Sequence, residues 1–150
     1  MAEYTYNPIQ LVEPNGNVIL NNNIRCPKGY VLHREESGIV ILRGIVNGNG
    51  CFARYQVTFN GNIAVPEDGT VGAIAVALAI DGEPILTSRA IVTPAAVDEY
   101  FNVTSTAIIT VPRGCCFNIA VENVSYGAMA ADPATAINVQ NANLTVTRIA

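Results

Sequence analysis

The stretch from Val65 to Val92 constrains the fold of this chain more than any other feature. Between Ala73 and Ile80, large aliphatic residues alternate strictly with alanines. The large residues are Ile74, Val76, Leu78 and Ile80, and the alanines are Ala73, Ala75, Ala77 and Ala79. Because successive side chains of a strand point to opposite faces, this segment predicts a strand with one bulky and one smooth apolar face. Neither face suits water, so we expect one face against the core and the other against a second layer, such as another copy of the chain.

Turn signals divide the rest of the chain into short strands. Asp81-Gly82 separates the alternating strand from a second apolar segment, and Asn47-Gly48-Asn49-Gly50 predicts a hairpin that joins strands at 38–46 and 51–60. We expect about eight to ten strands at about ten-residue spacing and no amphipathic helix. This pattern predicts an all-β fold, an antiparallel jelly-roll β-sandwich.

The first 17 residues differ from the remainder. They are polar and rich in turn residues, with Pro8, Pro14 and the pair Asn15-Gly16. We expect residues 1–17 to form an extended N-terminal arm and residues 18–150 to form a single jelly-roll domain, since a chain of 150 residues fits one domain.

Composition excludes several classes of partner. Only 13% of the residues are charged, the net charge is −4, and the 8 Lys and Arg residues are scattered. Nucleic-acid backbones and anionic membrane surfaces need clustered cations, so we expect neither partner. No apolar run is long enough for a membrane span, and the N-terminus has no basic, apolar signal pattern, so we expect folding in the cytoplasm.

The residues that carry enzyme chemistry form no recognisable constellation. His33 is the single histidine, no serine has a nucleophile context, and we expect His33 to be structural or interfacial. The adjacent acids Glu67-Asp68 and Asp98-Glu99 are typical of solvated turns rather than a glycosidase pair or a calcium site. The cysteines, which are Cys26, Cys51, Cys115 and Cys116, lack metal-site spacing, and we expect mostly buried, reduced thiols. The sequence therefore predicts no catalytic residue, no metal and no cofactor.

Tyrosines leave one alternative open. Aromatic rings stack on sugars, but tyrosines at strand ends serve packing and interfaces equally well. The candidates for sugar stacking are Tyr4, Tyr6, Tyr30, Tyr100 and Tyr126. A glycan-binding surface is thus the alternative function.

Three segments carry a family resemblance. They are the hairpin VGAIAVALAIDGEPI at 71–85, the turn VPRGCCFNIAVENVS at 111–125 and the ending INVQNANLTVTRIA at 137–150. With these motifs the chain resembles the trimeric jelly roll of the tumour-necrosis-factor/C1q type in its bacterial and phage versions, over most of residues 38–150. It is also similar to structural proteins of prophages, including virion decoration and head-fibre proteins. No collagen-like Gly-X-Y stalk is present, as a spore-surface version would have.

The resemblance implies a non-enzymatic homotrimer, made in the bacterial cytoplasm and then placed on a capsid surface or in a fibre. The expected partners are further copies of the chain and a capsid or other virion protein, with a surface glycan as the alternative. The alternative function is a glycan- or receptor-binding module on a phage fibre, cell or spore surface. The smooth strand face would form the oligomer interface, through Ala73, Ala75, Ala77 and Ala79. The arm would dock on the partner, through Tyr4, Tyr6, Pro8, Ile9 and Leu11.

Overall fold

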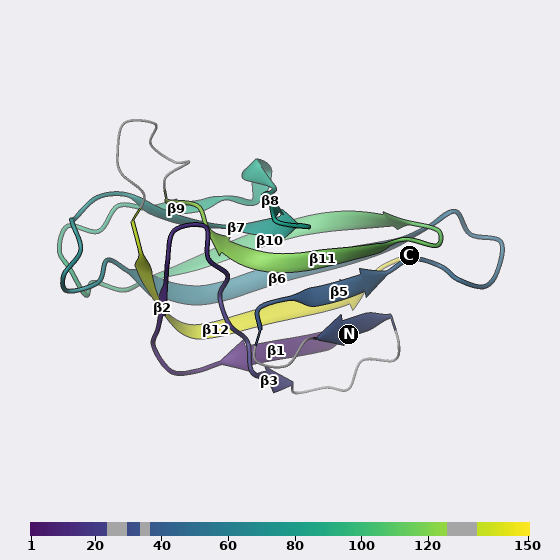
Figure 1. Cartoon of the computed structure of the whole chain (residues 1–150), viewed down its shortest axis with the longest axis horizontal. Helices are drawn as coiled ribbons and strands as arrows, with labels where there is room; N and C mark the ends of the chain where they lie inside the picture. The colour runs from purple at the N-terminus through teal and green to yellow at the C-terminus, as the bar shows by residue number, and fades with distance from the viewer. Residues whose placement is uncertain (24–29, 34–36, 126–134) are drawn as a thin grey trace.

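A computed structural model describes residues 1–23, 30–33, 37–125 and 135–150 and shows two antiparallel sheets packed face to face (Figure 1). In sheet A the strand order is β10-β6-β12-β1-β3, and β2 pairs with another part of β12. In sheet B the order is β4-β5-β11-β7-β8, and β9 also pairs with β7. The described residues thus confirm the jelly-roll β-sandwich that the strand spacing predicted.

The strands of sheet A are β1 (Ala2–Tyr6), β2 (Gln10–Val12), β3 (Asn22–Asn23), β6 (Phe52–Ala64), β10 (Phe101–Pro112) and β12 (Ile137–Arg148). The strands of sheet B are β4 (Val31–His33), β5 (Val40–Arg43), β7 (Ile74–Ile80), β8 (Glu83–Pro84), β9 (Ala90–Val92) and β11 (Cys116–Asn123). A short 3₁₀ helix, η1 (Leu86–Ser88), lies between β8 and β9.

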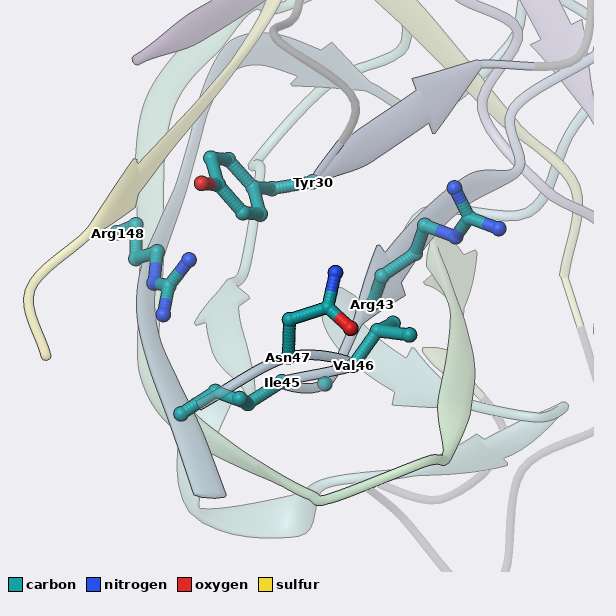
Figure 2. A pocket seen from close by; sticks show the side chains of 7 residues that line it. Tyr30, Arg43, Ile45, Val46, Asn47 and Arg148 are labelled. Atoms are coloured by element: carbon teal, nitrogen blue, oxygen red, sulfur yellow. The ribbon is translucent and has the colours of Figure 1, made fainter. Parts of the chain in front are cut away.

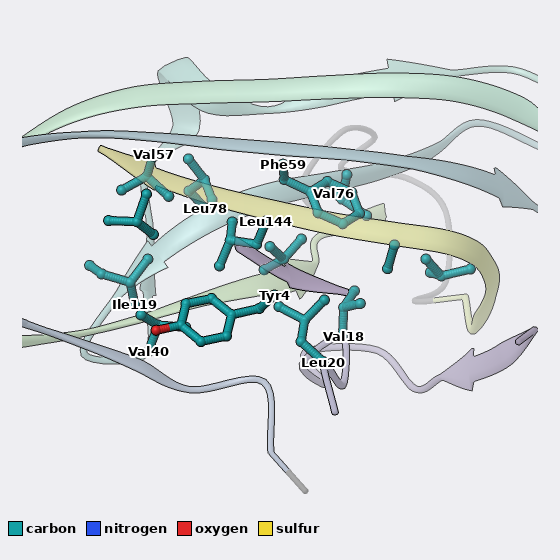
Figure 3. Packing of buried hydrophobic residues seen from close by; sticks show 14 of the residues in the cluster. Tyr4, Val18, Leu20, Val40, Val57, Phe59, Val76, Leu78, Ile119 and Leu144 are labelled. Carbon is teal, nitrogen blue, oxygen red and sulfur yellow. The ribbon is translucent and has the colours of Figure 1, made fainter. Parts of the chain in front are cut away.

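The core lies between the two sheets and is built from alternate residues of each strand. In β6, Val57 and Phe59 are buried whereas Gln56 and Asn60 are exposed. Figure 3 shows these inward side chains meeting residues of both sheets, among them Leu78. Alternation with a period of two therefore decides which face of each sheet is apolar.

The alternating strand of the sequence is β7, and its bulky face lies where it was expected. Ile74, Val76 and Leu78 are buried in the main core, and Ile80 packs against its margin. The following turn has positive φ angles at both central residues, 50° at Asp81 and 85° at Gly82. Such a turn suits a tight hairpin, because its twist matches that of the strands it joins, here β7 and the short β8.

The N-terminal segment lies within sheet A over much of its length. β1 pairs with β12 from Ala2↔Val146 to Tyr6↔Ala142, and β2 pairs with the beginning of β12. Tyr4 is 0% exposed and belongs to the main core. In these two stretches the segment contributes strands to the sandwich, and the division into an arm at 1–17 and a domain at 18–150 stays a prediction.

The turn at 47–50 joins different elements from those expected. β5 pairs with β4 and β11 in sheet B, whereas β6 pairs with β10 and β12 in sheet A. The predicted hairpin between residues 38–46 and 51–60 is therefore wrong. The chain crosses here from one sheet to the other, and Gly48, with φ of 105°, lies in the crossing.

The thiols are also placed differently from the prediction. Cys51, Cys115 and Cys116 are free and exposed, so the expectation of mostly buried thiols is wrong for these three. They lie in or beside the connections at one end of the sandwich, where a strand pattern does not determine burial. Cys26 lies outside the described residues.

Candidate functional site

His33 has a structural environment. Its Nε2 atom lies 3.0 Å from the main-chain oxygen of Ser37, and its ring lies 4.7 Å from the ring of Tyr4, measured between centroids. Among the described residues, no group of three or more His, Cys, Asp and Glu side chains is placed to hold a metal ion. The histidine thus packs against the first strand and faces no nucleophile in this part of the chain.

The two acidic pairs lie in connections at one end of the sandwich. Glu67 and Asp68 follow β6, Asp98 and Glu99 precede β10, and the Asp98 N–H donates to the Val65 oxygen at 2.9 Å. The Glu99 carboxylate accepts a hydrogen bond from the main-chain N–H of Ala96 at 3.2 Å. This local bond is typical of a turn, as expected from the sequence.

The alanine face of β7 is covered within a single chain. Ala75, Ala77 and Ala79 are fully buried, and the first two pack with Val124 in a small cluster separate from the main core. The Ala75 N–H donates to the Ser125 hydroxyl at 3.2 Å. Ala73 precedes β7 and is half-buried. The interface role of the four alanines stays a prediction, and the three buried ones would act through the shape of this face rather than by direct contact.

The five arm residues have contrasting environments. Tyr4 is buried, its hydroxyl has no hydrogen-bond partner among the described residues, and burial raises the pKa of Tyr4 to about 12. Tyr6 is half-buried against the core, whereas Pro8 is exposed and Ile9 and Leu11 are 54% and 57% exposed. The segment that contains the last three is therefore the part of the arm that is available to a partner.

The outer face of sheet A is polar and almost free of charge. Its outward side chains on the three strands β10, β6 and β12 are nearly all Asn, Thr or Gln. They are Asn102, Thr104, Thr106, Ile108 and Thr110 on β10, Gln56, Thr58, Asn60 and Asn62 on β6, and Asn143, Thr145 and Thr147 on β12. Of the described residues, the charged side chains Arg54 and Glu3 border this set. We call this set of twelve side chains the Asn/Thr face.

Hydrogen bonds hold the Asn/Thr face in register. Thr106, Thr58 and Thr145 are cross-strand neighbours, and the hydroxyl oxygens of Thr106 and Thr58 lie 2.5 Å apart. The Asn102 amide donates to the side-chain oxygens of Asn60 at 2.8 Å and Asn62 at 3.1 Å. These bonds lie along the sheet, so the face is ordered before any partner arrives.

β10 gives the Asn/Thr face an unusual border. It is 12 residues long, and among the described strands β6 is its partner in sheet A, so its other side is an edge. Ile108, near the middle of the strand, is 63% exposed. Long edges with exposed apolar residues promote pairing with another chain unless something covers them.

A pocket opens at the end of the sandwich opposite the acidic pairs. It has a volume of about 210 Å³ and is lined by Tyr30, Arg43, the connection 44–47 and Arg148 (Figure 2). The Arg148 guanidinium lies over the Tyr30 ring, 4.5 Å from its centroid. Of the tyrosines considered for sugar stacking, Tyr30 is the one placed at this pocket, and Tyr126 lies outside the described residues. Sequence reasoning missed the pocket because its residues come from three distant segments.

Comparisons with known proteins identify the fold. No protein-family model matches the sequence, and no curated protein matches it. Two solved structures align over nearly the whole chain, each at 12% identity. The globular domain of the zebrafish complement 1qA protein has a TM-score of 0.58 and covers 96% of this chain and 94% of its own. Murine APRIL, in a structure at pH 5.0, has a TM-score of 0.59 and covers 99% and 98%. The chain thus has the jelly-roll fold of C1q and TNF-like domains.

Proposed function

We propose that this chain is a non-enzymatic structural protein that assembles as a homotrimer through the Asn/Thr face and decorates a phage capsid or forms part of a head fibre. The observation that carries the self-association is the Asn/Thr face itself, together with the exposed edge of β10. The trimeric state is supported by the shared fold with C1q and TNF-like domains, which are typically trimeric, non-enzymatic modules. The virion role is supported by the resemblance of the sequence motifs to prophage structural proteins.

The chemistry of the Asn/Thr face suits association between copies. The cores of protein interfaces are depleted of charged residues, since burying an unpaired charge costs several kcal/mol. Here a set of twelve side chains contains no charge, and Ile108 adds an apolar contact at its β10 border. Identical copies can meet on such a face without juxtaposing like charges, which a net charge of −4 would otherwise make costly.

The exposed part of the N-terminal segment supplies a second contact surface. Pro8, Ile9 and Leu11 lie on and beside β2, which pairs with the first residues of β12. The side chains of Ile9 and Leu11 lie two positions apart, and each is more than half exposed. They form a small apolar patch that a capsid protein can cover. We expect this patch to dock the trimer, while Tyr4 in the same segment stabilises the fold.

Sedimentation tests the proposal. Without added ligand, the wild-type protein is expected to sediment with the mass of three chains of 15.9 kDa each. Thr106→Arg places a charge in the middle of β10, at the border of the Asn/Thr face, and should yield a folded monomer. Thr87→Arg is the matched control, because Thr87 is an exposed threonine in η1, away from this face.

Two results would count against parts of the proposal separately. A wild-type monomer at micromolar concentration refutes self-association, whereas a trimer that Thr106→Arg leaves intact refutes the assigned face.

The Ile9→Ser, Leu11→Ser double variant tests docking. It should remain trimeric but fail to co-sediment with phage capsids that the wild-type chain binds, and undiminished capsid binding would contradict the docking role.

A further inference from the structure

The pocket beside Arg148 is a concave polar site that the proposed assembly does not use. It lies at the end of the sandwich where β12 and β5 finish, and β12 directs residue 148 toward the space between the sheets. Figure 2 shows the side chains of Arg148 and Asn47 reaching into the same space, with Tyr30 beside them. Arg148 has the same strand parity as the buried residues Leu144 and Val146, opposite to the Asn/Thr face.

Fixed contacts hold the walls of the pocket. Arg148 Nε donates to the main-chain oxygen of Ala150 at 3.1 Å, while its guanidinium stacks on Tyr30. Behind them the buried Tyr55 donates its hydroxyl proton to the main-chain oxygen of Arg43 at 2.5 Å, which fixes the end of β5. The Nε bond and the stacking orient the guanidinium. The side chain therefore loses less conformational entropy when its terminal nitrogens bind a ligand.

The charges around the pocket favour an anion. No carboxylate lies among its described lining residues. Two further arginines have their main chain at the same end: the main-chain N–H of Arg54 donates to the Ala150 oxygen at 3.2 Å, and the main-chain N–H of Arg113 donates to the Cys51 oxygen at 2.9 Å, while the Arg54 guanidinium lies over the Phe52 ring, 4.9 Å from its centroid. The acidic pairs lie at the other end of the sandwich, where Glu67 and Asp68 follow β6, and Asp98 and Glu99 precede β10. They are separated from this end by the 13 residues of β6, about 40 Å of extended strand.

We propose that this pocket binds the carboxylate of a small acidic sugar, with Arg148 as the principal ligand-binding residue. A guanidinium edge matches the two oxygens of a carboxylate, and its planar face is already supported by Tyr30. The Asn47 amide lines the same cavity and offers donors and an acceptor for sugar hydroxyls. The volume of about 210 Å³ is below the usual range for drug-sized ligands, which limits the occupant to about one sugar ring.

An NMR titration of the full chain tests the proposal with three probes: D-galacturonate, D-galactose and acetate. The resonances to follow are the Asn47 side-chain amide and the Arg148 Nε–H. Galacturonate should shift both and saturate, acetate should bind more weakly because it lacks the ring, and galactose should bind weakest of the three because it lacks the carboxylate. Arg148→Ala should weaken galacturonate binding by about tenfold to a hundredfold, the usual effect of losing hydrogen bonds to a charged group.

Two further variants control for charge and folding. Arg113→Ala removes one positive charge from the same end of the molecule but not from the pocket, so it should change the galacturonate affinity less than threefold. Arg148→Lys keeps the charge but lacks the planar fork, and it should still bind galacturonate several times more weakly than the wild type. Arg148→Lys carries the test if Arg148→Ala fails to fold.

Each outcome decides the matter. Absence of binding by both acids, equal binding of galactose and galacturonate, or an unchanged affinity in Arg148→Lys overturns the carboxylate site. Equal binding of acetate and galacturonate overturns the sugar assignment. Arg148 lies off the Asn/Thr face, so Arg148→Lys should sediment like the wild type, and failure of this proposal leaves the assembly proposal standing.

Discussion

The outer faces of the two sheets differ in how much of their surface is left open to a partner. Sheet A displays the Asn/Thr face to its surroundings, hydrogen-bonded along the sheet and uncharged. Sheet B carries alanines on its outer side, and Ala75, Ala77 and Ala79 are already covered within the chain. The face that looked more apolar in sequence is thus the one with least surface to offer a partner, and the polar face is the one left open.

This difference shows that an apolar strand face does not by itself identify an interface between chains. Alternating Ile and Ala in β7 require that both faces be buried, but this requirement does not specify whether the same chain or a second copy provides the cover. In the structure the chain provides it: Ala75, Ala77 and Ala79 are fully buried, and Val124 packs beside Ala75 on the same face. An interface is better identified by ordered surface without charge that the fold leaves open.

The largest expected effect comes from placing a charge on the covered face. Ala77→Asp puts an unpaired carboxylate where the wild-type residue is fully buried, and should cost about 3–5 kcal/mol of unfolding free energy. Ala73→Asp, at the half-buried position before β7, is the matched control and should cost much less. Urea unfolding measures both, and equal midpoints for the two variants would show that the alanine face is open.

An intermediate effect concerns the acid that lies on this same face. Glu122 pairs with Ala77 across β11 and β7 and is 5% exposed. Burial, and secondarily the Glu83 carboxylate, raise the pKa of Glu122 above its ordinary value of 4.5. The folded state therefore holds this proton more tightly than the unfolded state, so the contribution of Glu122 to stability falls as the pH rises from about 4.5 through the raised pKa.

Glu122→Gln removes that titration. In the variant, the unfolding free energy should decline less over this pH interval than in the wild type, as measured by urea unfolding at a series of pH values. Glu67→Gln, at an exposed turn position, is the control and should leave the pH dependence as it is. Identical curves for the wild type and Glu122→Gln would contradict the burial of the carboxylate.

The smallest expected effect is on the open face. Asn102→Ala removes the amide that donates to Asn60 and Asn62 on exposed strands, and should cost the monomer no more than about 1 kcal/mol. The same change loosens the order of the Asn/Thr face, so the trimer should dissociate at higher protein concentration. A stability loss as large as that of Ala77→Asp would mean that this face supports the fold and not the assembly.

The sequence predicted much of the fold because two local signals were strong. The Ile/Ala alternation located β7 and its buried face, and Asp81-Gly82 located the turn that follows. Local signals failed where the structure depends on which strand a segment pairs with. Residues 47–50 have the composition of a hairpin turn yet connect different sheets, and the polar spacing of residues 1–17 concealed that Tyr4 fills the core.

The candidate sites were less accessible to sequence reasoning. The Asn/Thr face depends on the registers β10–β6 and β6–β12, which bring together residues 40 or more positions apart. The pocket needs Tyr30, Asn47 and Arg148 at one end of the sandwich, and no motif links them. Alternating Thr and Asn along β10 and β12 was the available signal for a polar outer face, and it specifies no partner.

Hydrogen exchange of the wild-type protein at a high and a low concentration tests the central claim most directly. If copies associate through the Asn/Thr face and the edge of β10, amides of residues 101–111 should be protected at high concentration and exchange faster on dilution. Amides of Ile74–Ile80 should exchange equally slowly at both concentrations, because the chain itself covers the alanine face. Dilution that leaves β10 unchanged and exposes β7 would contradict the account and return the interface to the alanines.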